Sequence, residues 1–171
     1  KALIADRQNS GGTDSDIYRI DLAGGAAENL TPHTKPTLFG ATDVSPDGKT
    51  LLITSNEKGG RDNVALLDLA TKKRTWVTDL QWEVTSGDFS PDGKWLTYEI
   101  NEDGRRDVYL ATAGGSDAHR IDLPPGINAT AGRPRAFSPK GDELLVSHQS
   151  STQPADFWVV DLATGRSTQL T

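Results

Sequence analysis

The stretch DFSPDGKWLTYEINEDGRRDVYLAT, from Asp88 to Thr112, holds a turn between two strand-like segments. Proline in SPDG fixes φ near about −65°, and the Asp-Gly pair supplies residues that reverse the chain. The run WLTYEI follows the turn, and a polar loop, NEDGRR, separates it from the run DVYLAT. Short apolar and aromatic runs divided by turn residues predict consecutive antiparallel strands.

The same turn recurs as SPDG at 45–48, SPDG at 90–93 and SPKG at 138–141, with the prolines 45 and 48 residues apart. An apolar run follows each copy: TLLITS, WLTYEI or ELLVSH. The chain start, KALIADR, matches the same run without a turn before it. A third strand-like element and a short polar return follow each run, so each unit holds four strands in about 45 residues.

A repeated four-stranded antiparallel unit of this period is typical of β-propeller blades. A sandwich or a barrel would not require turn, loop and strand sequences to recur in step. We therefore predict an all-β fold, a single partial β-propeller of about four blades. The expected blades span 1–35, 36–80, 81–126 and 127–171, and the first lacks its innermost strand.

The repeat, read in FSPDGKWL with DVYLAT and in FSPKGDELL with DFWVVDLATG, resembles the TolB-like propeller repeat. That repeat also builds the N-terminal propeller of prolyl-oligopeptidase-family (S9-type) serine peptidases. The resemblance covers nearly the whole chain. It implies the propeller fold more strongly than any one function, because peptidases, TolB-like proteins and some lyases share it.

In these peptidases the propeller filters substrates for a separate hydrolase domain, which carries a Ser-Asp-His triad on a G-x-S-x-G turn. This sequence has no G-x-S-x-G, and its Ser86-Gly87 pair lacks the flanking pattern. The expectation is therefore a non-catalytic chain, a fragment of a larger protein in which it gates peptides for a serine peptidase. The alternative is a TolB-like module that binds a partner protein.

The repeated turn could also be interpreted as part of a metal loop or a phosphate cradle. However, Lys140 replaces the aspartate in the third copy, and a ligand role would not tolerate that change. The three histidines, His33, His119 and His148, lie in different repeat contexts without metal-site spacing. A sugar-processing lyase on this repeat would need a His-rich metal site. We expect no catalytic, cofactor-binding or metal-binding residues and no cofactor.

Polar positions on the innermost strands are the candidates for lining a central channel. Arg133 and Arg135 are two residues apart and are expected on one face of a strand, where they could hold a carboxylate or a peptide C-terminus. Asp43 and Asp88 occupy equivalent places in two repeats. The alternative for the arginines is that they balance neighbouring carboxylates on a solvated wall.

The 171 residues carry a net charge of −6 and include no cysteine. An acidic chain offers no electrostatic support for nucleic-acid binding, and no apolar run is long enough to span a bilayer. We expect a soluble, bacterial-type protein of the cytoplasm or periplasm, the compartment being open. Expected partners are a second copy that closes a ring, or the remaining propeller and a hydrolase domain, with a peptide or protein ligand.

Overall fold

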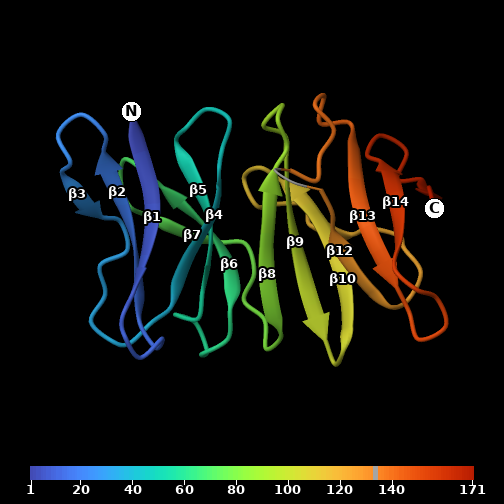
Figure 1. Cartoon of the computed structure of the whole chain (residues 1–171), viewed down its shortest axis with the longest axis horizontal. Helices are drawn as coiled ribbons and strands as arrows, with labels where there is room; N and C mark the ends of the chain where they lie inside the picture. The colour runs from blue at the N-terminus through green and yellow to red at the C-terminus, as the bar shows by residue number, and fades with distance from the viewer. Residues whose placement is uncertain (133–134) are drawn as a thin grey trace.

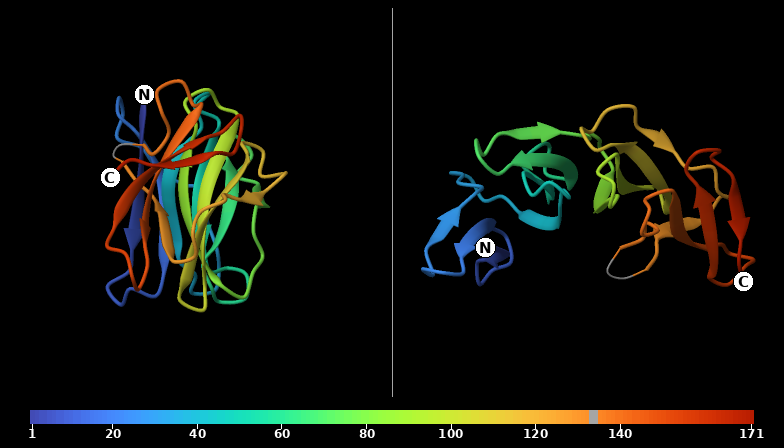
Figure 2. Two further views of the ribbon diagram at one scale, coloured as in Figure 1. Left: turned by 90° about the vertical axis from the view of Figure 1, so that its right-hand side faces the viewer. Right: turned by 90° about the horizontal axis from the view of Figure 1, so that it is seen from above.

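A computed structural model describes residues 1–132 and 135–171, which form fifteen strands and no helix. The strands stand side by side in upright sheets (Figure 1). Seen from above, the sheets follow an arc, with the two chain ends at its opposite ends (Figure 2, right). The predicted all-β propeller segment is confirmed. The described chain contains no helix that could span a membrane.

The first sheet consists of β1 (Ala2–Gln8), β2 (Ser15–Asp21) and β3 (Ala27–Asn29). The second consists of β4 (Phe39–Val44), β5 (Thr50–Ser55), β6 (Asn63–Asp68) and β7 (Arg74–Trp76). The third consists of β8 (Glu83–Phe89), β9 (Trp95–Glu102), β10 (Arg105–Thr112), β11 (His119–Arg120), β12 (Ile127–Thr130), β13 (Glu143–Gln149), β14 (Asp156–Asp161) and β15 (Ser167–Gln169).

The third sheet joins two antiparallel units, β8–β11 and β12–β15, through one parallel contact between β10 and β12. The amide of Arg106 donates to the carbonyl of Gly126 over 3.1 Å. A Cβ on Gly126 would lie 2.3 Å from the carbonyl oxygen of Gln149, so only glycine permits this approach. The sequence predicted units 81–126 and 127–171 as separate blades, and the structure joins them in one sheet through this single contact between β10 and β12.

The repeated SPDG segments are confirmed as turns. The hydroxyl of Ser45 donates to Asp47 over 2.7 Å and accepts from the amide of Thr50 over 3.0 Å. Gly48 has φ of 71°, in the left-handed region that favours glycine. Ser90, Asp92 and Gly93 repeat these contacts in the next unit.

The third turn keeps the geometry although Lys140 replaces the aspartate. Asp142, two residues further on, accepts from the hydroxyl of Ser138 over 2.6 Å. The same hydroxyl accepts from the amide of Glu143. In all three turns a carboxylate therefore accepts from the serine hydroxyl, but in the third turn it comes four residues after the serine instead of two.

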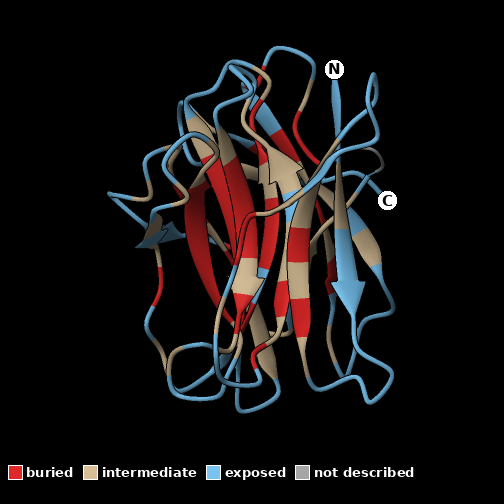
Figure 3. Cartoon of the chain, turned by 90° about the vertical axis from the view of Figure 1, so that its left-hand side faces the viewer, coloured by how far each residue is buried: buried red, intermediate tan, exposed pale blue. Residues whose placement is uncertain are grey.

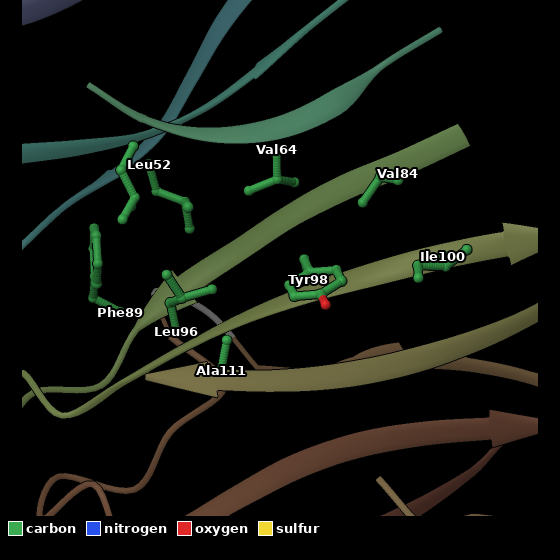
Figure 4. Packing of buried hydrophobic residues seen from close by; sticks show 9 residues of the cluster. Leu52, Val64, Val84, Phe89, Leu96, Tyr98, Ile100 and Ala111 are labelled. Carbon is green, nitrogen blue, oxygen red and sulfur yellow. The ribbon is translucent and has the colours of Figure 1, made fainter. Parts of the chain in front are cut away.

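Apolar side chains on both faces of the middle sheets form the core. On β5, Leu51 and Ile53 pack against the first sheet, whereas Leu52 packs against β8 and β9. Figure 4 shows Leu52 and Val64 opposite Leu96 and Tyr98 in the second of these interfaces. Burial of both faces explains why TLLITS and NVALLD are continuous apolar runs instead of alternating ones.

A polar clamp closes the outer edge of three units. In the second sheet, the hydroxyl of Thr78 donates to Asn63 over 2.8 Å and accepts from the amide of Val64 over 2.9 Å. Thr31 on Asp16 and Thr171 on Asp156 make the equivalent contacts. The threonine that follows each outermost strand, β3, β7 or β15, is thus hydrogen-bonded to the start of the neighbouring strand, β2, β6 or β14.

We expect Thr78→Val to lower the free energy of unfolding by about 1–3 kcal/mol, because buried Asn63 and the amide of Val64 would lose a partner. Urea unfolding followed by circular dichroism measures the change. Thr75→Val, at an exposed position on β7, is the matched control. Equal stability of the two variants would contradict the clamp.

Candidate functional site

The first strands of the four-stranded units, β4, β8 and β12, lie on the concave side of the arc (Figure 2, right). A hollow of about 330 Å³ opens among them. Hydroxyls and three charged groups dominate its lining: Thr42, Thr85, Ser86, Thr130, Asp88, Glu99 and Arg106. This polar hollow is the candidate functional site.

Beside the hollow, the carboxylate of Asp43 contacts residues of the two following units. One carboxylate oxygen accepts from the amide of Phe89 on β8 over 3.0 Å. The other forms a 3.1 Å ion pair with Arg135, which also donates to the carbonyl of Phe89 over 3.4 Å. Since the carboxylate is only 14% exposed and both partners are in other units, Asp43 has a structural role.

Asp88 makes the corresponding contact one unit further on. Its carboxylate accepts from the amide of Ala136 over 3.2 Å. Thus the carboxylate at the end of one inner strand holds the backbone of the next unit at two successive interfaces. At the third equivalent place stands Ala136, which has no carboxylate.

Second strands supply a similar contact. Asp6 accepts from the amide of Ala41 over 3.2 Å. Glu99, at the matching position of β9, accepts from both the amide and the hydroxyl of Thr130, over 2.8 and 2.9 Å. Arg106 lies 3.6 Å from the other oxygen of Glu99.

Burial raises the pKa of the Asp6 carboxyl, and the Ala41 amide opposes that effect. The hydroxyls of Thr42 and Ser86 contact each other across two units. The site can therefore offer hydroxyl donors and acceptors and the guanidinium of Arg106 to a polar chain.

Of the four residues predicted to line a central channel, the structure describes three: Asp43, Asp88 and Arg135. Asp43 and Arg135 are brought together in one ion pair, and Asp88 lies at the rim of the hollow. Arg133 lies outside the described residues. The expectation that Arg135 lies on a strand is wrong: β12 ends at Thr130, and Gly132 takes φ of 97°, which ends the extended conformation.

Asp6, Glu99, Arg106 and Thr130 were not predicted. Asp6 and Glu99 occupy the same place in KALIADR and KWLTYEI, so aligning these runs could have identified both. Their role depends on contacts between units, which no single repeat reveals. Within the described ranges, no group of three or more His, Asp or Glu residues could hold a metal ion.

His33 lies between two carboxylates at the junction of the first and second sheets. Its Nε2 is 2.7 Å from Asp14, and its Nδ1 is 2.8 Å from the carbonyl of Thr31 and 3.3 Å from Asp16. Burial lowers the pKa of His33, but these hydrogen bonds and charges outweigh it and raise the pKa above 6.5. All of its near partners are acceptors, so the doubly protonated ring satisfies them best.

No protein-family model and no curated protein sequence matches the chain. Among solved structures, TolB from Acinetobacter baumannii is 23% identical with a TM-score of 0.68, over 99% of this chain and 40% of that one. Prolyl oligopeptidase B from Galerina marginata is 12% identical with a TM-score of 0.77, over 100% and 24%. An oligogalacturonate lyase is 13% identical with a TM-score of 0.67, over 97% and 52%.

These similarities confirm the TolB-like propeller repeat as the fold of this chain. All three are below 25% identity, so they concern the fold alone. The chain spans between about a quarter and half of each of these proteins.

We expect Asp43→Ala to lower the free energy of unfolding by about 1.5–3 kcal/mol, because the buried amide of Phe89 and the guanidinium of Arg135 both lose a charged partner. Asp43→Asn keeps an acceptor and should lose less. Glu102→Gln, at an exposed position on β9, is the control for removing one negative charge. If Asp43→Ala unfolds at the same urea concentration as the control, the contact does not stabilise the fold.

Because the folded state raises the pKa of His33, protonation stabilises it. That stabilisation is complete below the unfolded pKa of 6.5 and is lost as pH rises through the higher folded pKa. The difference in melting temperature between wild type and His33→Gln should therefore be larger at about pH 5.5 than at about pH 8.5. His119→Gln, at an exposed position, is the control. A difference that does not change with pH would contradict the assignment.

Proposed function

We propose that this chain is the non-catalytic, substrate-gating propeller portion of a prolyl-oligopeptidase-family serine peptidase. The observation that carries the proposal is the polar hollow on the concave side, where hydroxyls from three successive units face a common space. An extended peptide presents backbone amides and carbonyls that such hydroxyls can bind in many registers. Weak, exchangeable contacts of this kind suit a surface that guides peptides without retaining them.

Gating by size requires a wall of fixed width. The carboxylate contacts of Asp43 and Asp88 on inner strands and of Glu99 on a second strand attach each of these strands to the backbone of the next unit. They stiffen the concave wall, so that a single extended peptide is admitted and a folded protein is excluded. The chain's own residues thus select and orient substrate, and the bond-breaking groups belong to the hydrolase domain.

The second candidate function is a TolB-like module that docks a partner protein. The observation that favours it is the similarity to TolB, which has the highest identity of the three structures and extends over 99% of this chain. Both candidates leave this chain without a catalytic role, and they differ in what the remaining protein contains.

The test uses the protein made from the natural gene with its own start and stop codons, treated with a fluorophosphonate that labels activated serines. The gating proposal expects one labelled serine outside residues 1–171 and hydrolysis of short peptides but not of folded proteins. No labelled serine, together with capture of a partner protein, would overturn it in favour of the docking module. The 171-residue chain alone is the control and should be neither labelled nor active.

A further inference from the structure

The junction between the second sheet and the unit β8–β11 holds a pocket of about 430 Å³. The connection from β7 to β8 forms one wall, and β9 and β10 form the other. The strands of the core are buried and the connections at the sheet edges are largely exposed (Figure 3), and the pocket lies where the two meet. We call it the aromatic pocket, lined among others by Val77, Leu80, Trp82, Tyr98, Glu102 and Tyr109. Both walls belong to the middle units of the chain, away from its two ends.

Two stacked tyrosine rings form the floor of the aromatic pocket. Tyr98 on β9 and Tyr109 on β10 are cross-strand partners, with ring centroids 5.3 Å apart and planes inclined by 10°. Tyr98 is only 3% exposed and lies beside Ile100 along β9 (Figure 4). Trp82 is 39% exposed, so its indole ring is available to a ligand.

The two other junctions do not repeat this set of three aromatic rings. The strand registers give the residues at the same places as Trp82, Tyr98 and Tyr109. They are Thr37, Ile53 and Ala65 at the first junction, and Gly126, Val146 and Trp158 at the last. Packing one unit on the next therefore does not require three aromatic residues here, whereas the turns and carboxylate contacts that serve the fold recur from unit to unit.

The charges around the aromatic pocket favour a cation. Of the two carboxylates that line it, Asp79 forms a 2.8 Å ion pair with Lys58. The cross-strand neighbour of Glu102 is Arg105, whose guanidinium pairs with Asp107 instead, over 2.8 Å. Within the described part of the chain, no hydrogen bond or ion pair occupies the carboxylate of Glu102, so it remains available to a ligand.

We propose that the aromatic pocket binds the side chain of an arginine in an extended peptide. A guanidinium is attracted to the negative face of an indole ring such as that of Trp82, and its planar fork pairs with a carboxylate such as that of Glu102. Its alkyl stem packs against the apolar groups of Val77 and Leu80. A volume of about 430 Å³ is larger than one arginine side chain and leaves room for the adjoining peptide backbone.

The aromatic pocket is separate from the polar hollow, since the two share no lining residue. They lie on opposite faces of β9: Tyr98 and Ile100 line the pocket, and Glu99 between them lines the hollow. The inference therefore does not rest on the proposed function. It adds a second binding site, with a preference for arginine that the hydroxyls of the hollow do not supply.

A nuclear magnetic resonance titration of the isotope-labelled 171-residue chain tests the proposal. The probe is the peptide N-acetyl-Gly-Arg-Gly-amide, and the control peptide carries citrulline, which has the shape of arginine without its charge. The indole N–H signal of Trp82, assigned by its absence in Trp82→Phe, should shift saturably with a dissociation constant of about 0.1–1 mM. The citrulline peptide should bind about tenfold more weakly, because it loses the attraction to the rings and to Glu102.

Two variants locate the site, with binding followed through the backbone amide signal of Leu80. Trp82→Ala and Glu102→Gln should each weaken binding of the arginine peptide about five- to tenfold. Both residues are exposed, so folding should persist, which circular dichroism checks. Glu57→Gln removes the carboxylate at the same place in the second sheet, where it pairs with Arg74, and should leave binding unchanged. No saturable shift, equal binding of the two peptides, or wild-type affinity in both pocket variants would overturn the proposal.

Discussion

Each unit of this protein has two apolar faces, and the fold depends on covering both. A strand buried on both sides cannot alternate apolar and polar residues, so β5 and β6 read as continuous aliphatic runs. Apolar packing between sheets has little directional preference. What sets how one sheet sits on the next must therefore be polar, and at the inner edge it is a carboxylate.

The carboxylates of Asp6, Asp43, Asp88 and Glu99 act across the gap between units. Each accepts a backbone amide of the next unit, three of them on its inner strand and the fourth at Ala136, beyond the end of β12. Such charged acceptors make strong hydrogen bonds. The polar character of the concave wall thus follows first from the need to join the units, and the hydroxyl-lined hollow exists between these joints.

The sequence predicts the fold well because the turns are local. Ser45, Asp47 and Gly48 make their contacts within six residues, and the repeat copies them. The site is predicted less well because its contacts join residues far apart. Asp43 and Asp88 were identified by their equivalent places, but not their amide partners some 46 and 48 residues away. Arg135 was misplaced on a strand because nothing in its own repeat shows that β12 ends at Thr130, before the positive φ of Gly132.

The hydrogen bond between Arg106 and Gly126 should make local stability differ along the chain, because it joins two of the units and not the others. In repeat proteins each unit contacts only its neighbours, so the stability is approximately a sum of the contributions of single units and of the interfaces between them. Here the last two units are joined in one sheet by the single contact between β10 and β12, whereas the first and second sheets share no ladder. Amide exchange should thus be slower in β9, β10 and β13 of the joined sheet than in the sheets that share no ladder with a neighbour.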